Sequence, residues 1–302
     1  MLQSLLQIST AQPLQSYKTT KDWSIAYYQL TKEKAPIDKA ILGGFTCQQF
    51  SFAFMAGYQA ALTQMFPTIA PNELKALCVS EAGGGHPKAI QTTLVDNQLN
   101  GIKTYVTAGS EVAHLLVLCK TNQAANGHPV LKMVHVPSHS PHTEITNFEL
   151  AFMRDVKHGK LTLQNTKITE TQILEGDGYS DYTKPFRTLE DICVGAAYQA
   201  MLLRQAIENN WEANVRDSIL LNIYTLKNLL TLPPSAPATH LLLAANEQHF
   251  ENNLPSIEAN IATNTPIPFR EDWTLNKKVV SCLLYTSPSP RDRTRSRMPS
   301  SA

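Results

Sequence analysis

The chain has 302 residues and a formal net charge of +1, with 17% charged residues, a length that can bury one large core or about two or three smaller ones. A charge balance this close to zero gives no reason to expect nucleic acid or an anionic membrane as a partner, and the longest apolar run is too short to cross a bilayer. The first residues lack a signal peptide's pattern, and five scattered cysteines without CxxC spacing argue against disulfides or structural zinc and favour a reducing cytoplasm.

Residues 1–76 are predicted to form an N-terminal helical region. In "TCQQFSFAFMAGYQAALTQMF" large apolar side chains recur every four residues and make one apolar face of a helix: Phe50, Phe54, Tyr58 and Leu62. Pro67 is expected to end this helix. An earlier helix is expected in "DWSIAYYQLTKEK".

Residues 77–172 change period and are predicted to form a middle β domain. Five segments have strand length with alternating or β-branched residues: "LKALCVSE", "NGIKTYVT", "HLLVLCKT", "LKMVHVP" and "GKLTLQNTKI". Turn signals separate them at Asn100-Gly101, Asn126-Gly127 and His158-Gly159. Short strands with brief connections favour an antiparallel sheet or barrel over βαβ units.

Residues 183–281 return to helical periodicity. Thr188 and Asp191 resemble a capping box at the start of "TLEDICVGAAYQAMLLRQAIENN". A second helix is expected in "NVRDSILLNIYTLKNLLTL", which Pro233-Pro234 ends, and two more in "ATHLLLAANEQHFENNL" and "DWTLNKKVVS". Together the three regions predict an α+β fold with N-terminal helices, a central antiparallel β-barrel or sheet, and a C-terminal helical bundle.

Residues 282–302 differ in composition from the rest of the chain. The stretch "CLLYTSPSPRDRTRSRMPSSA" has the Ser, Arg and Pro content of a disordered basic tail. It also resembles a translated sequencing-library adapter, and we therefore expect a non-native tail that begins after about Ser281. The tail is left out of the fold prediction.

The segment "LCVSEAGGGHPKAIQTTL" contains three consecutive glycines that could serve as a phosphate loop, a linker or a turn. The spacing fits neither GxxxxGK[ST] nor GxGxxG, which disfavours a nucleotide phosphate loop. Apolar "LKALCV" runs directly into the glycines, which disfavours a flexible linker. The remaining possibility is a turn that lets the backbone approach a flat cofactor closely.

Two stretches in this order resemble the middle domain of the acyl-CoA dehydrogenase family. The family pattern C-V-[TS]-E-x-x-x-G matches the run from Cys78 to Glu81, followed by Gly85. The pattern N-G-x-K-x-[WY]-[IV]-T-x-G matches residues 100–109. Strands and then helices follow, as the family expects, so that the resemblance covers most of residues 45–281.

The resemblance implies an FAD-dependent protein whose flavin ring lies against these two stretches. Val79, Ser80, Tyr105 and Thr107 would line the isoalloxazine, with the Thr107 hydroxyl near N5. Gly85 and its neighbours would offer backbone amides to the pyrophosphate or to substrate phosphates. The residues that the resemblance implies for cofactor binding are Val79, Ser80, Gly85, Tyr105, Thr107 and Gly109.

The family's reaction also needs a carboxylate that removes the α-proton of an acyl thioester, and desolvation suits a carboxylate to this task. The late Y-E-G motif of most members is not found. A minority place the glutamate at the start of the first C-terminal helix, which makes Glu190 the candidate base, although Asp191 replaces the arginine that follows there. An acidic residue in a first helical turn also favours the helix dipole without any catalysis, and this alternative stays open.

Two other patterns fit a function less well. The family's R-x-Q-F-G segment, which grips the adenosine half of FAD, is represented only by Arg204 and Gln205. The histidines of "HVPSHSPH" have no accompanying carboxylate or cysteine pattern and favour an exposed loop over a metal site: His135, His139 and His142.

The resemblance therefore implies α,β-desaturation of an acyl thioester with hydride transfer to flavin N5, in cytoplasmic fatty acid metabolism. It implies acyl-CoA as substrate, an electron-transfer flavoprotein as candidate acceptor and a homo-oligomer, with no metal. The alternative is a non-catalytic relative that has lost the base and binds an acyl-CoA or a protein.

Overall fold

The computed structural model describes residues 14–123 and 129–284. Its contacts divide the chain into two compact units. The sheet unit consists of Tyr17–Lys32 and Ala61–Arg187, and the helical unit of the described residues 14–16, Glu33–Ala60 and 188–284. The division into domains at 1–76, 77–172 and 183–281 stays a prediction.

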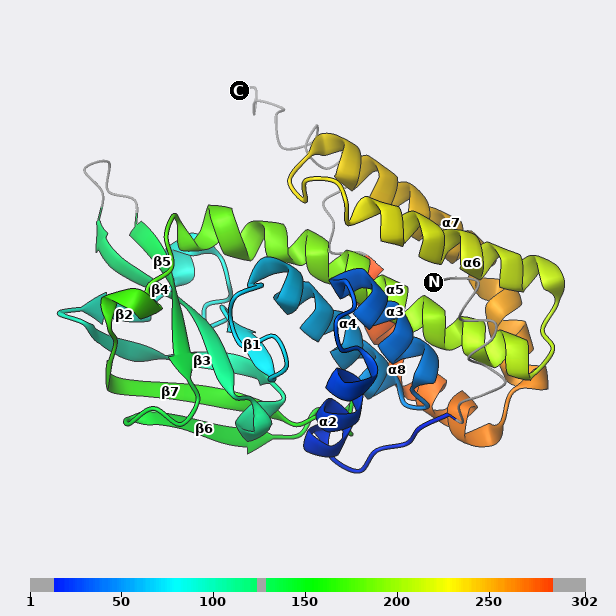
Figure 1. Ribbon diagram of the computed structural model, residues 1–302, viewed down its shortest axis with the longest axis horizontal. Helices are drawn as coiled ribbons and strands as arrows, with labels where there is room; N and C mark the ends of the chain where they lie inside the picture. The colour runs from blue at the N-terminus through cyan, green and yellow to red at the C-terminus, as the bar shows by residue number, and fades with distance from the viewer. Residues whose placement is uncertain (1–13, 124–128, 285–302) are drawn as a thin grey trace, which may run out of the picture. The chain divides into compact units, whose positions relative to one another are not determined.

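The sheet unit is built around one seven-stranded sheet (Figure 1). The strands follow in the order β1-β4-β2-β3-β7-β6, and β5 pairs with β4. Strand β4 lies between β5 on one side and the short β1 and β2 on the other, which pair with successive parts of it. The bounds are Lys75–Cys78 (β1), Thr93–Val95 (β2), Gln98–Thr107 (β3), His114–Gln123 (β4), Pro129–Pro137 (β5), Thr143–Phe148 (β6) and His158–Lys167 (β7).

An antiparallel barrel or sheet was predicted; the structure has a sheet, but it is open rather than a barrel, and it is mixed rather than antiparallel throughout. Strand β4 runs parallel to β1, with Lys75 opposite His114, and parallel to β2, with Thr93 opposite Lys120. The brief connections predicted antiparallel pairs because each strand was assumed to pair with the next one in sequence. The parallel pairs join strands that are not consecutive. The chain reverses between β2 and β3 and again between β3 and β4, which leaves β4 parallel to β1 and β2.

The five predicted strands are present, but β2 and β6 were not predicted. The Asn100-Gly101 signal does not mark a turn, because both residues lie inside β3. A Cβ atom on Gly101 would lie 2.7 Å from the Cα of Thr92, so the glycine permits a close approach of these two backbones. The Asn126-Gly127 signal lies outside the described residues.

Helix α2 (Thr20–Leu30), expected in "DWSIAYYQL", belongs to the sheet unit. The side chain of Thr19 caps it by accepting from the Asp22 amide. The Tyr28 hydroxyl donates to the Glu73 carbonyl oxygen at 2.8 Å, and the Lys21 amide donates to the Glu111 carboxylate at 3.2 Å. These bonds attach α2 to the segments that flank β1 and β4.

The helical unit contains most of α4 and α5, the predicted helices that follow them, and α3, which was not predicted. Helices α6 and α7 pack against each other (Figure 1). Helix α7 continues through Pro255, and the helix expected from Asp272 begins earlier. The bounds are Pro36–Thr46 (α3), Phe50–Met65 (α4), Lys184–Glu208 (α5), Ala213–Leu229 (α6), Pro237–Asn264 (α7) and Ile267–Leu284 (α8). Residues 285–302, most of the predicted tail, lie outside the described residues.

Helix α5 begins earlier than the predicted capping box. A π-helical turn, Gly178–Thr183, runs directly into it, and Asp177 caps that turn by accepting from the amides of Tyr179 and Ser180. Thr188 therefore lies inside the helix, and the prediction that Thr188 and Asp191 cap its start is wrong. Asp177 offers its carboxylate to the amides of the turn and so removes the need for a cap further on.

Four cysteines of the described part of the chain are buried and form no disulfide: Cys47, Cys78, Cys119 and Cys193. Burial raises the pKa of the Cys78 and Cys119 thiols to about 12, so both are neutral at physiological pH. No helix in the described part of the chain is long and apolar enough to cross a membrane.

Candidate functional site

The two stretches that carry the family resemblance lie side by side in the sheet unit. Thr104 of β3 donates from its amide to the Ser80 carbonyl oxygen at 2.9 Å and from its hydroxyl to the same oxygen at 3.1 Å. Thr107 lies three residues further along β3, a distance of about 10 Å at the rise of a strand. We call Val79, Ser80 and residues 104–107 the wall.

The wall carries two hydroxyl groups that no described residue engages. Ser80 and Thr107 are half-buried, and neither side chain forms a hydrogen bond with the described part of the chain. A hydroxyl can both donate and accept, so it can serve a ligand in either role. The sequence predicted both residues as flavin contacts.

The glycine stretch forms an exposed, tight turn beside the wall. The Glu81 amide donates to the Gly84 carbonyl at 3.2 Å, and the Gly84 amide donates to the Glu81 carbonyl at 2.8 Å. Gly84 has φ +94°, and no atom lies within 4 Å of the position that a Cβ would take there. A Cβ on Gly85 would lie 3.3 Å from Val79 and 3.7 Å from the Ser80 hydroxyl. The turn thus folds back over the wall and leaves its backbone open.

A bulge in β3 turns Tyr105 outward. The pairing of β3 with β7 slips by one residue between Lys103 and Val106, and such bulges commonly re-aim a side chain. Tyr105 is 53% exposed, and the edge of its ring meets Phe148 of β6 at 5.7 Å between centroids. An exposed aromatic ring therefore lies two residues before Thr107 on the same strand.

His158 lies directly opposite Thr107 in the ladder of β3 and β7, and no sequence pattern predicted a functional role for it. Its side chain is buried. Its Nδ1 lies 3.1 Å from the Val156 carbonyl, which only accepts, so Nδ1 carries the hydrogen. Burial lowers the pKa of His158, partly opposed by the Val156 bond, so a neutral imidazole flanks Thr107. Only the strand register, which the sequence does not contain, reveals this neighbour.

Gly109 has a packing role that explains why it is glycine. It follows Ala108 (φ +72°) and has φ +53°, so two consecutive residues are left-handed. A Cβ on Gly109 would collide with the amide oxygen of Asn147, which accepts from the Ser110 amide at 2.8 Å. The predicted contact of Gly109 with a cofactor stays a prediction.

Glu190 lies in the helical unit, within α5 and well past its start. Asp177 caps the helical segment from Gly178 on, so Glu190 is not in a first turn and the helix dipole does not explain an acidic residue there. Glu190 raises the pKa of the Cys193 thiol, an effect second to burial. Its role as base stays a prediction.

Arg204 points into the helical unit. Its side chain is 1% exposed, forms an ion pair with Glu208 one turn later and lies over the ring of Phe45, with 5.3 Å to the centroid. This arrangement stabilises the unit and does not present the guanidinium at the surface.

The histidines of "HVPSHSPH" do not converge on a metal site, and the described residues contain no group of three or more His, Cys, Asp or Glu suited to one. His135 instead contacts His114, with 2.9 Å between Nε2 and Nδ1. The other nitrogen of His114 lies 3.1 Å from the carboxylate of Glu73. A carboxylate only accepts, so the neutral chain of bonds runs from His135 through His114 to Glu73.

Neither a protein-family model nor a curated protein sequence matches this chain. Solved structures do match in fold, among them the following three. The prolyl acyl carrier protein oxidase AnaB has a TM-score of 0.69 at 12% identity, over 97% of this chain and 96% of its own. An FAD-dependent dehydrogenase has a TM-score of 0.67 at 15% identity, over 97% of this chain and 94% of its own. Butyryl-CoA dehydrogenase from Megasphaera elsdenii has a TM-score of 0.60 at 12% identity, over 94% of this chain and 96% of its own. The fold of this chain is therefore similar to that of acyl-CoA dehydrogenase-like flavoproteins.

Proposed function

We propose that this chain is a flavin-dependent oxidoreductase of acyl-CoA dehydrogenase type, with α5–α8 as its C-terminal bundle. The observation that carries the proposal is the wall itself. Two hydroxyls that no described residue engages, Ser80 and Thr107, occur along two hydrogen-bonded segments next to an open glycine turn. This donor set fits a flat, polar-edged ring with a phosphate tail, because the backbone is open where a phosphate would approach.

Different residues of the wall would contact different parts of FAD. The hydroxyls of Ser80 and Thr107 would hydrogen-bond the polar edge of the ring, and Tyr105 and Val79 would cover its apolar part and exclude water. Amides of the turn that ends at Gly85, other than the Glu81 and Gly84 amides that bond within the turn, would donate to phosphate oxygens. When bound, FAD supplies the two-electron acceptor for α,β-desaturation of an acyl thioester.

Glu190 would take the α-proton, and the electron pair of that C–H bond would form the second bond of the new double bond. The β-hydrogen would leave with its own electron pair, as a hydride to the flavin. The same proposal includes acyl-CoA as substrate, an electron-transfer flavoprotein as acceptor and a homo-oligomer. Oligomeric state is measured by sedimentation, and acceptor choice by reoxidation of the reduced protein.

Anaerobic titration of the purified full chain with FAD, and then with acyl-CoAs of increasing length, tests the function. We expect FAD to bind and its visible absorption to bleach with one chain-length class. Glu190→Gln should keep FAD binding and slow bleaching by about 10²–10⁴-fold, the usual contribution of a general base. Asp191→Asn is the matched neighbour and should bleach normally. Unchanged bleaching in Glu190→Gln would remove that residue from the reaction.

The alternative, a non-catalytic relative, draws on a different observation. Arg204, the cation kept from the family's FAD-gripping segment, is buried against Glu208 and Phe45. A colourless protein that binds no FAD but binds an acyl-CoA in a calorimetric titration would favour this alternative.

A further inference from the structure

A buried ion pair lies directly behind the wall. The Lys103 ammonium is 2.7 Å from the Glu81 carboxylate, and the two side chains are 0% and 5% exposed. Both residues belong to the stretches that carry the family resemblance, where the sequence offered no role for either. Their chemistry is unusual for a sheet interior, since charged groups are almost never buried without a partner.

Glu81 is satisfied by four hydrogen bonds. Besides Lys103, one carboxylate oxygen accepts from the Thr92 amide at 3.1 Å and from its hydroxyl at 2.7 Å, and the other accepts from the Gln91 amide at 2.6 Å. Burial alone would raise the pKa of Glu81, but the bonds from Lys103, Thr92 and Gln91 outweigh it and hold the pKa below its usual value. The carboxylate is therefore ionised.

Lys103 binds the wall with a second bond. Its ammonium donates to the Val79 carbonyl at 3.2 Å, and the next residue, Thr104, donates twice to the Ser80 carbonyl. The carbonyls of two consecutive wall residues are thus fixed from β3. Gly101 of β3 lets Thr92 approach this strand closely. Thr92 bonds to Glu81, and Glu81 pairs with Lys103, two residues after Gly101 on β3.

We propose that Glu81 and Lys103 are a positioning pair, which holds the Val79–Ser80 backbone in place and sets the charge behind the ligand that the wall receives. The proposal rests on the proposed function, because it takes the ligand to be a flavin. A buried ion pair seldom adds stability over a well-packed apolar pair, and removal of one partner leaves an uncompensated charge. Such a pair suits a site that needs a fixed backbone position and a set electrostatic potential at its ligand.

The first measurement needs no cofactor. Lys103→Met keeps the length of the side chain and removes both of its bonds. Amide hydrogen exchange on the full chain should then be about tenfold faster at Thr104, the loss expected for a bond to a charged group. The Val134 amide in β5 serves as the internal control for global unfolding and should not change. Equal acceleration at both amides, or none at Thr104, would overturn the holding role.

The second measurement uses the FAD-loaded protein. Lys103→Met leaves a negative charge behind the wall and should shift the equilibrium toward oxidised flavin. Burial lowers the pKa of Lys103 and Glu81 opposes this, so in Glu81→Gln the pKa of Lys103 falls further. Measured at a pH below that pKa, Glu81→Gln leaves a positive charge and should shift the equilibrium the other way, by about threefold or more each in the ratio of the two forms. The double variant should return toward the parent. A merely structural role would move both single variants in the same direction.

The exposed pair Lys277–Glu258 supplies matched controls, since Lys277→Met and Glu258→Gln change the same charges on α8 and α7. Neither control should shift the flavin ratio. Single variants that shift the ratio in the same direction, or not at all, overturn the charge role while the proposed function stands. A chain that binds no FAD overturns the proposed function, and the exchange measurement then decides whether the pair holds the wall.

Discussion

Glu247 lies on the buried face of α7, one turn after Leu243 and one turn before Glu251. Burial and the charge of Glu251 act on its side chain, and no cation of the described residues is among the groups that shift its pKa. Burial, with a further contribution from Glu251, raises the pKa of Glu247 to about 8. The residue is therefore a neutral acid at physiological pH and a source of pH-dependent stability.

Glu247→Gln should stabilise the protein at alkaline pH. Between the unfolded pKa and about pH 8 the folded state holds a proton that the unfolded state has lost, so the stability of the parent falls as pH rises. The variant's advantage should be small at pH 5, grow toward pH 8 and level off above it. Denaturant unfolding at each pH measures it, with Glu271→Gln at an exposed position of α8 as control. A constant difference at every pH would contradict the explanation.

The contact between His135 and His114 predicts the opposite dependence. Burial, then His114 and Lys75, lower the pKa of His135, so the folded state resists a proton that the unfolded chain accepts. Stability is therefore present above the unfolded pKa of His135 and lost as pH falls toward the folded one. Tyr28 also lies near Glu73, and burial, with a further contribution from the Glu73 charge, raises its pKa out of this window.

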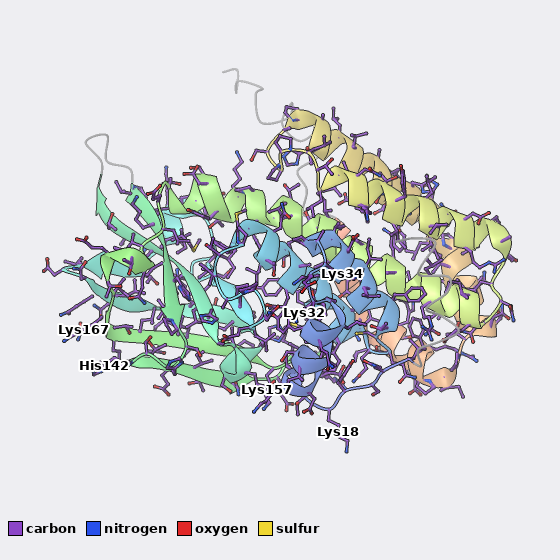
Figure 2. All side chains as sticks on the ribbon, in the orientation of Figure 1. Lys18, Lys32, Lys34, His142, Lys157 and Lys167 are labelled. Carbon is purple, nitrogen blue, oxygen red and sulfur yellow. The ribbon has the colours of Figure 1, made fainter. Side chains whose placement is uncertain are left out.

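His135→Phe should flatten the fall in unfolding free energy between about pH 7 and pH 5, since it removes the titrating group. His142→Asn is the control, because His142 is exposed, has φ +63° and lies at the surface in Figure 2. The control should keep the parent's slope. A slope that stays steep in His135→Phe would assign the acid sensitivity to other groups.

At the scale of elements, β3 carries most of the candidate site. It contains an irregularity near Gly101, a bulge between Lys103 and Val106, and the wall residues that follow. The sequence predicted the strand but not these irregularities. The Asn-Gly pair has the composition of a turn, and only its closeness to Thr92 shows why glycine is needed inside a strand.

Gly101→Ala should destabilise the protein by about 1–3 kcal/mol, the usual cost of forcing atoms into a packed position. Its Cβ would lie 2.7 Å from both the Cα and the Cβ of Thr92, and a shift of Thr92 would disturb its bond to Glu81. Gly83→Ala is the matched control, since its Cβ would meet only Ala89 at 3.5 Å, and it should stay within about 0.5 kcal/mol. Urea unfolding measures both, and similar losses would exclude the packing explanation.

The helices were easier to predict than the strands. Regular spacing of apolar residues in α4 and α6 survives without any tertiary information. Strand β2 has only three residues and so no measurable period, and β6 is largely exposed and lacks clear alternation. The start of α5 was misplaced because Asp177 caps a π turn whose pattern the sequence rules do not include.

At the scale of the whole molecule, each compact unit draws on separate stretches of chain. Helix α2 precedes α3 and α4 in sequence but belongs to the sheet unit. The local motifs located the wall, since Val79, Ser80 and Gly85 are close in sequence. They did not reveal how β3 and β7 bring His158 to Thr107, because that neighbourhood depends on strand register.

A fragment of residues 61–187 contains all seven strands and should still fold poorly. It lacks α2, and with it the bonds from Tyr28 and Lys21 to the sheet unit, each worth about 1 kcal/mol. Residues 17–187 restore α2 and should give better dispersed amide signals in a nitrogen–proton NMR spectrum. Equal dispersion in the two fragments would show that α2 is dispensable.

The open sheet also has a consequence for handling the protein at high concentration. A sheet that does not close must end somewhere, and here the row ends at β6, whose Thr143–Phe148 segment carries a single charge, Glu144. Terminal strands of this kind can recruit the same strand from another molecule. Refolding yield should therefore depend on dilution, and a lysine introduced at Thr146 should protect against precipitation.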